Sequence, residues 1–120
     1  MAHLYPLPRG PRVCLRMPRA ADAADAAGIR ALCERSGAQL CELELARLVR
    51  FDPRHRIVIC ATALLDGREA MVGIGAIELA GGVEHPDTLV VDEGLTEGLD
   101  DLLHRALVGR AQALTRTRAA

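Results

Sequence analysis

The chain has 120 residues and a mass of 12.9 kDa, which is enough for one hydrophobic core and too little for two. Half of its residues are apolar and only 2% are aromatic, so the composition excludes a disordered chain and predicts a core of aliphatic side chains. The 15 basic and 16 acidic residues leave a net charge of −1, which excludes a dedicated nucleic-acid binder, and no apolar run is long enough to span a membrane.

The first segment of the chain is rich in proline. Pro6, Pro8 and Pro11 fall within residues 1–11, so we expect a flexible arm without ladder hydrogen bonds, outside the domain. Residues 12–17 then alternate between apolar and other side chains and predict a first strand. We assign the domain to residues 12–114 and a C-terminal tail to residues 115–120.

Two helices are predicted next. An Ala-rich stretch follows Pro18 and ends at Ser36-Gly37, where glycine favours a left-handed cap. A second helix covers residues 39–50 and is stopped by Asp52-Pro53.

Three strands come after the helices. Residues 57–65 are apolar or Thr throughout, as in a strand that is covered on both faces. Asp66-Gly67 predicts a hairpin turn into a returning strand at residues 71–79. Gly73 and Gly75 within that strand indicate a bulge or a close backbone approach, and a short strand follows at residues 88–91.

The last predicted element is a helix at residues 96–115 with one apolar face. Thr96 is its predicted N-cap, and the apolar residues recur at three- and four-residue steps. These residues are Leu99, Leu102, Leu103, Ala106, Leu107 and Leu114.

The predicted elements define an α+β fold of two layers, with three helices and a four-stranded, mainly antiparallel sheet. Three segments of it are similar to motifs of the GNAT acyltransferase superfamily. They are Val13 to Asp22, with an Arg-x-x-x-x-x-Asp pattern from Arg16, Met71 to Ile77, with Val-Gly in a strand, and Leu89 to Glu93, with a Leu-x-Val pattern. The chain therefore resembles the front half of this superfamily over residues 12–114, and no counterpart of the usual back half follows Leu114.

The resemblance implies a site for acyl-coenzyme A. The backbone of the family's fourth strand, here Leu89 and Val91, would lie along the pantetheine, and Gly98 would hold the pyrophosphate at the start of the following helix. The family's loop pattern of Arg or Gln, two residues, Gly, one residue and Gly or Ala is absent. If Gly98 is the first glycine of this pattern, Leu95 occupies the Arg or Gln position and Asp100 occupies the last position. If Gly94 is the first glycine, Val91 and Thr96 occupy these two positions.

Charge argues against the cofactor independently of the motifs. Five carboxylates and no cation lie between residues 92 and 101, where a pyrophosphate would dock. Like charges at about 4 Å repel by about 1 kcal/mol even in water. These carboxylates are Asp92, Glu93, Glu97, Asp100 and Asp101. We therefore expect no cofactor, with acetyl-coenzyme A as the alternative.

No catalytic residue is assigned. Glu78, Glu84 and His85 are the nearest candidates for a general base by position, although an ordinary solvated strand or loop residue is the simpler interpretation. Arg54-His55-Arg56 is a compact basic cluster that could meet a phosphate or an acidic partner, or be an ordinary solvated loop.

The four cysteines indicate neither a metal site nor disulfides. Cys14, Cys33, Cys41 and Cys60 lack metal-ligand spacing, and no secretory h-region precedes them. We expect free thiols in a cytoplasmic protein and no bound metal.

These observations predict a degenerate, non-catalytic GNAT-like domain that acts as a binding or assembly module. The alternative is an N-acetyltransferase whose cofactor site is completed by a second chain, and a small-molecule sensor that uses the same cleft is a third possibility. Two features predict a homodimer or a protein partner: the unpaired edge of the strand at residues 88–91 and the apolar stripe of the last helix.

Overall fold

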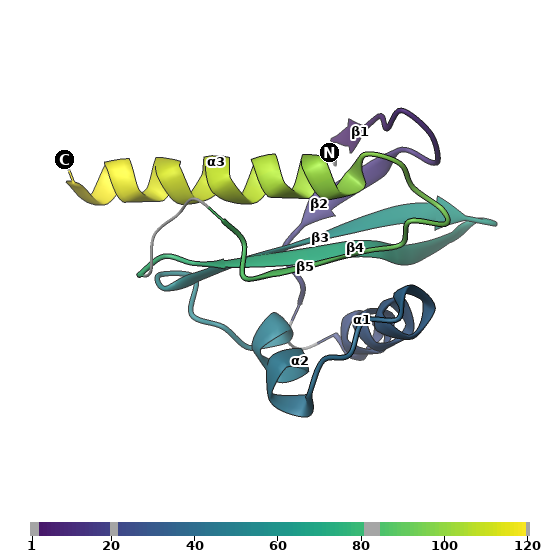
Figure 1. The fold of residues 1–120 in the computed structure, drawn as a ribbon, viewed down its shortest axis with the longest axis horizontal. Coiled ribbons are helices and arrows are strands. Elements are labelled where there is room, and N and C mark those ends of the chain that lie inside the picture. The colour runs from purple at the N-terminus through teal and green to yellow at the C-terminus, as the bar shows by residue number, and fades with distance from the viewer. Residues whose placement is uncertain (1–2, 20–21, 81–84, 120) are drawn as a thin grey trace.

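The computed structural model describes residues 3–19, 22–80 and 85–119. Figure 1 shows α3 on one face of a twisted sheet and α1 and α2 on the opposite face. The fold therefore has three layers, and the prediction of two layers is wrong. In the described part of the chain the elements are β1 (Leu4–Tyr5), β2 (Val13–Arg16), α1 (Ala23–Ser36), α2 (Glu42–Val49), β3 (Arg56–Leu65), β4 (Arg68–Glu78), β5 (Thr88–Val91) and α3 (Leu99–Ala119).

The sheet has the strand order β1-β2-β3-β4-β5, and every neighbouring pair is antiparallel. The α+β class, the three helices and the antiparallel sheet are confirmed. The predicted number of four strands is wrong, because Leu4 pairs with Cys14 and Tyr5 pairs with Val13. A strand of two residues just before Pro6 has no hydrophobic period, so the sequence pattern could not indicate it.

Local signals set two of the connections. Asp66 and Gly67 have φ angles of 52° and 78°, as the tight turn of the β3–β4 hairpin requires. Gly37 has a φ of 74°, and its N–H donates to the carbonyl of Cys33 at the end of α1. Both predicted turns are confirmed. Asp22, the acid of the Arg-x-x-x-x-x-Asp pattern, accepts from the N–H of Ala24 and caps the start of α1.

One apolar face of α3 packs against β4. Its contact residues are at most 1% exposed and follow a four-residue period: Leu99, Leu103, Leu107 and Ala111. A Cβ atom at Gly75 would lie 2.6 Å from Leu107 Cδ1, so glycine allows the close approach of the helix. The register shifts between Ala61 and Thr62 of β3, opposite Gly73, so the sheet also contains a bulge here.

This packing removes one reason to expect self-association. The apolar stripe of α3 is buried inside a single chain, so the helix does not need a second copy to cover it. The expected dimer now depends on the edge of β5 alone.

The start of α3 differs from the prediction. The helix begins at Leu99, and the carbonyl of Gly98 accepts its first intrahelical bond, from the N–H of Leu102 at 3.1 Å. Thr96 is not the N-cap, because its hydroxyl donates to the carbonyl of Asp92 at 2.8 Å.

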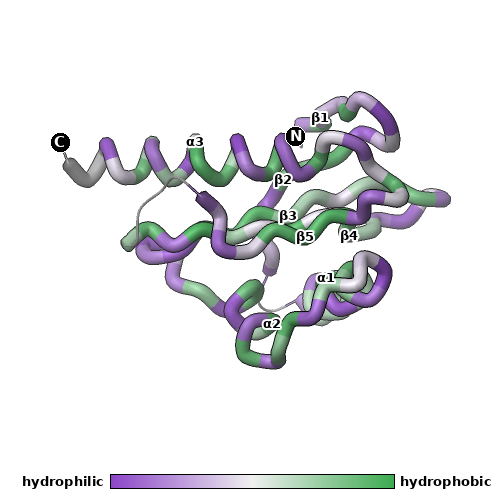
Figure 2. The backbone as a smooth tube through the Cα atoms, in the orientation of Figure 1, coloured by the Kyte–Doolittle hydropathy of each residue, from purple (hydrophilic) through white to green (hydrophobic). Residues whose placement is uncertain are grey.

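The opposite face of the sheet packs against α1 and α2. Val58, Cys60 and Ile74 of the sheet contact Leu32 of α1 and Leu48 of α2 in one buried cluster. Figure 2 shows the corresponding pattern, with hydrophobic colour concentrated along β3, β4 and β5 and alternating colour along the helices. Both faces of the central strands are therefore covered, as the continuous apolar run at residues 57–65 predicts.

Candidate functional site

The candidate site is the outer edge of β5. The N–H of Asp92 donates to the carbonyl of Val72 on β4 at 2.8 Å, which places Asp92 at a hydrogen-bonded position of the antiparallel ladder. Hydrogen-bonded positions alternate along such a ladder, so Val90 also faces β4. The peptide groups of Leu89 and Val91 therefore point away from β4. No strand pairs with this edge in the described part of the chain, so these groups are available to a partner.

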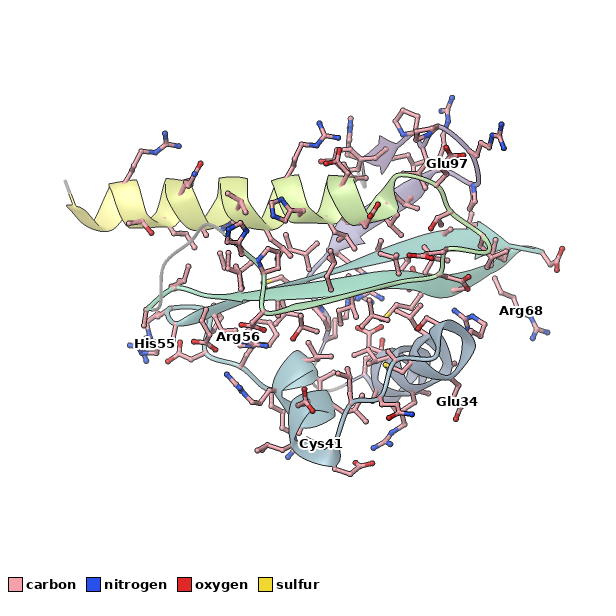
Figure 3. All side chains as sticks on the ribbon, in the orientation of Figure 1. Glu34, Cys41, His55, Arg56, Arg68 and Glu97 are labelled. Atoms are coloured by element: carbon pink, nitrogen blue, oxygen red, sulfur yellow. The ribbon has the colours of Figure 1, made fainter. Side chains whose placement is uncertain are left out.

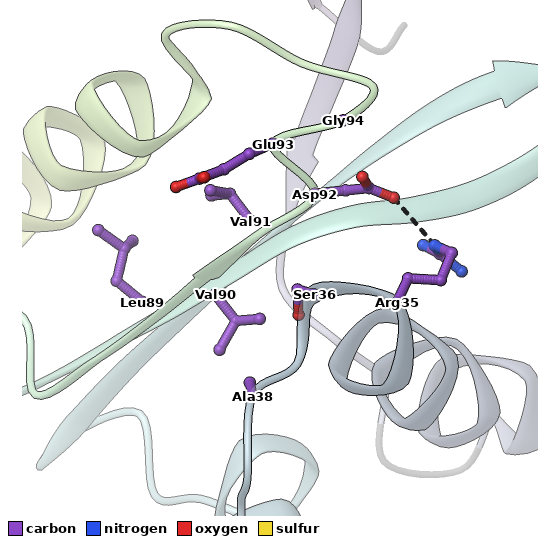
Figure 4. Close-up of a pocket in the computed structure, with 9 residues that line it drawn as sticks. All are labelled: Arg35, Ser36, Ala38, Leu89, Val90, Val91, Asp92, Glu93 and Gly94. Atoms are coloured by element: carbon purple, nitrogen blue, oxygen red, sulfur yellow. Dashed lines mark hydrogen bonds and ion pairs between the residues drawn. The ribbon is translucent and has the colours of Figure 1, made fainter.

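An open pocket of about 470 Å³ runs along this edge. It is lined by the continuous segment Leu89–Gly94 and, from the end of α1, by Arg35, Ser36 and Ala38. Figure 4 shows Val90 pointing toward Ala38, while Leu89 and Val91 point to the opposite side of the strand. The structure thus brings together the predicted residues Leu89 and Val91 at a strand edge that borders a pocket.

One cation reaches the pocket from α1. Arg35 Nε donates to Asp92 Oδ2 at 2.9 Å (Figure 4), and Arg35 Nη2 also donates to the carbonyl of Met71 at 2.8 Å. Asp92 is 8% exposed, so this pairing compensates a largely buried carboxylate. Sequence reasoning missed Arg35, because 57 residues separate it from Asp92 and no local pattern links them.

A second pocket of about 320 Å³ adjoins the first at the start of α3. Val91 and Glu93 line both pockets, and Glu97, Gly98 and Asp100 also line the second. All three ionisable groups in this second lining are carboxylates. The negative charge that the sequence predicts at the start of this helix is therefore present in the structure.

The N-terminal arm packs against the same corner. A Cβ atom at Gly98 would lie 3.0 Å from Pro8 Cδ, so the arm covers one side of the helix start. The N–H of Glu97 donates to the carbonyl of Arg9 at 3.1 Å, and Arg9 Nε lies 3.4 Å from Glu97 Oε2. Figure 3 shows Glu97 beside this arm. The N-terminal arm thus reduces the space beside Gly98, the predicted pyrophosphate position, and carboxylates line the pocket there.

The candidate general bases are not gathered at the edge of β5. Glu78 Oε1 accepts from Arg47 at 2.7 Å and from Arg56 at 2.8 Å, so Glu78 is held in ion pairs at the end of β4. The ring of His85 lies 6.1 Å from the ring of His104 on α3. Glu84 lies outside the described residues.

The basic cluster Arg54-His55-Arg56 is divided by the fold. The Arg56 side chain is 7% exposed and donates to Glu78 and to both carboxylate oxygens of Asp87. Arg54 and His55 are exposed and lie next to Asp52. A single solvated basic patch is therefore absent from this part of the structure, and Arg56 instead stabilises the ends of β3, β4 and β5 (Figure 3).

The four cysteines are free thiols that differ in exposure. Cys60 is fully buried, and this burial raises the pKa of its thiol to about 12. Burial also raises the pKa of the Cys33 thiol. Neither thiol is a nucleophile at neutral pH, because only the thiolate reacts.

We expect a thiol reagent to modify Cys41 in the native protein and to leave Cys33 and Cys60 unmodified until the chain unfolds. Cys41 is exposed at the start of α2. Mass spectrometry of the protein after a timed reaction, with and without denaturant, measures this order. Modification of Cys60 at the same rate as Cys41 would contradict the burial of the β3 core.

Searches for other sites and for relatives add no assignment. Among the described residues, no group of three or more His, Cys, Asp or Glu side chains is placed to hold a metal ion. No helix in the described ranges is long and apolar enough to cross a membrane.

Comparison of the chain with protein-family models, curated proteins and solved structures finds no significant match. The likeness to the GNAT superfamily therefore remains a proposal that depends on the motifs.

Proposed function

We propose that this chain is a non-catalytic, GNAT-like binding or assembly module whose docking surface is the outer edge of β5. The observation that carries the proposal is the orientation of Leu89 and Val91, whose peptide groups face away from β4 beside a pocket of about 470 Å³. A partner in extended conformation can satisfy these groups by adding a strand to the sheet.

Charge supports a binding role over acetyl transfer. The pocket at the start of α3 is lined by Glu93, Glu97 and Asp100, whereas a bound pyrophosphate needs cations or exposed N–H groups there. The general-base candidate Glu78 is held by two arginines. Glu78 is therefore not available as a general base beside this strand edge.

The proposal predicts that the chain does not bind acetyl-coenzyme A with ordinary affinity. We expect isothermal titration to give no saturable heat at micromolar protein concentration, because the acidic pocket repels the phosphates. A matched variant, Glu93→Gln with Glu97→Gln and Asp100→Asn, should bind the cofactor more tightly than the original chain. A dissociation constant of about 1 μM or tighter for the unmodified chain, near −8 kcal/mol, would favour the transferase instead.

A further inference from the structure

We infer that the partner of the β5 edge is an extended peptide segment with a basic residue, bound antiparallel to β5. This inference rests on the proposed function and specifies the chemistry of its partner. Its basis is the continuity between the strand edge and the acidic pocket, which share Val91 and Glu93.

The backbone of such a segment has a defined place. Leu89 and Val91 offer outward N–H and C=O groups at two alternate positions, so an antiparallel strand can exchange hydrogen bonds with both. Leu89 is 38% exposed, and an apolar partner side chain opposite it would cover this surface on the α3 side.

Charge sets the preference for a basic segment. Glu93 and Asp100 make no ion pair in the described part of the chain, and Glu97 makes one exposed pair with Arg9. The only cation that lines either pocket, Arg35, already donates to Asp92. A cationic side chain opposite Glu93 would therefore meet carboxylates that lack other partners.

A second copy of this chain fits the same edge less well. In the two-fold register that sets Leu89 opposite Val91 of the second copy, Glu93 and Asp87 lie at the flanks of the paired strands. The carboxylate of Asp87 already accepts from Arg56 through both of its oxygens, so this register brings no unpaired cation to Glu93. A basic peptide supplies such a cation, and a second copy does not.

The test uses the peptide acetyl-Arg-Thr-Val-Thr-Val-Thr-amide as the probe. Antiparallel pairing sets its two Val residues opposite Val91 and Leu89, and its Arg then lies just beyond the end of β5, beside the turn that carries Glu93. The control peptide has Glu in place of Arg. Nuclear magnetic resonance titration of the whole chain at low salt gives both the affinity and the amides that shift.

We expect the Arg peptide to shift the amides of Leu89 and Val91 and to bind about 10-fold more tightly than the Glu peptide. This preference should shrink at about 0.5 M salt, because exposed charges are then screened. Glu93→Gln should reduce the preference, whereas the matched control Asp66→Asn removes a carboxylate of the β3–β4 turn, which lines neither pocket, and should leave the preference unchanged.

A backbone variant tests the docking mode separately. Leu89→Pro removes an outward N–H without removing a ladder bond to β4, so the variant should fold and bind neither peptide. Circular dichroism confirms the fold of this variant. Unchanged binding to Leu89→Pro would overturn the inference.

The outcomes separate this inference from the proposed function. Equal affinity for both peptides, with shifts at Leu89 and Val91, would overturn the basic preference and support the docking edge. A mass twice that of the chain in light scattering, with these two amides protected in the absence of peptide, would overturn the inference in favour of a second copy. A monomer that shows no shift with either peptide would overturn both the inference and the docking edge.

Discussion

Replacing Leu103 by Asp is expected to unfold the chain. Leu103 is fully buried between α3 and the sheet, in a cluster with Val13, Val72 and Leu99. The change removes a buried leucine, which costs about 2–5 kcal/mol, and places a polar group without a partner in an apolar core, which costs several kcal/mol more. The sum is comparable to the whole stability of a domain of this size, about 5–15 kcal/mol.

Far-ultraviolet circular dichroism and thermal denaturation measure this effect. The matched control is Leu43→Asp, because Leu43 is 70% exposed in the first turn of α2. An acid near the start of a helix is favourable, so this control should change stability by less than about 0.5 kcal/mol. A folded, monomeric Leu103→Asp variant of a dimeric protein would show that the stripe of α3 is an interface and not the core.

The second large effect is expected for Asp25→Asn. Arg16 donates to both carboxylate oxygens of Asp25, at 2.8 and 2.7 Å, and the N–H of Arg19 donates to the same carboxylate at 2.7 Å. The side chains of Asp25 and Arg16 are 4% and 15% exposed. Neutralising Asp25 leaves a largely buried guanidinium without its main counter-charge, so we expect a loss of about 3–5 kcal/mol in urea denaturation.

The matched control for this change is Glu69→Gln. Glu69 accepts from the same arginine at 2.8 Å but its side chain is 57% exposed. An exposed pair contributes less than about 1 kcal/mol, so the two variants separate burial from simple charge pairing. Equal losses for both variants would contradict the buried role of Asp25.

The same pair predicts a pH dependence. The hydrogen bond from Arg16, with that from the Arg19 backbone, holds the pKa of the Asp25 carboxyl below its usual range. In the unfolded chain the pKa of this carboxyl is about 3.9. Because the pKa of Asp25 is lower in the folded state, its ionisation stabilises the fold fully at pH values about one unit or more above the unfolded pKa, that is, above about pH 5. This stabilisation is lost as the pH falls through the folded pKa.

The stability difference between the original chain and Asp25→Asn should therefore stay constant from neutral pH down to about pH 5 and narrow below about pH 4. Urea denaturation at a series of pH values measures this difference. A difference that is independent of pH throughout would show that ionisation of Asp25 contributes nothing to it.

Elements with local signals can be predicted from the amino-acid sequence alone. The apolar residues at three- and four-residue steps from Leu99 predicted that α3 has one buried face, because residues at this spacing share one side of a helix. The structure buries Leu99, Leu103 and Leu107 of that face and adds Ala111. Asp66-Gly67 and Gly37 predicted a turn and a cap, because their backbone angles depend only on the residues themselves. The strand at residues 88–91 was also predicted from its sequence, whereas its place at the sheet edge followed from the resemblance, which offered no counterpart of the family's next strand.

Contacts between residues far apart in the sequence depend on how the helices and strands pack together. The strand Leu4–Tyr5 exists because β2 offers it a partner, and its two residues carry no period of their own. Arg35 reaches Asp92 because α1 ends beside β5, and Arg56 is buried because three strand ends converge on it. Hydrophobic pattern and residue propensity predict the conformation within one helix or strand. Ion pairs and pocket linings depend instead on the order of the strands in the sheet and on the helices that pack against it. That order places three of the five carboxylates between residues 92 and 101 in one pocket, which adjoins the outer edge of β5.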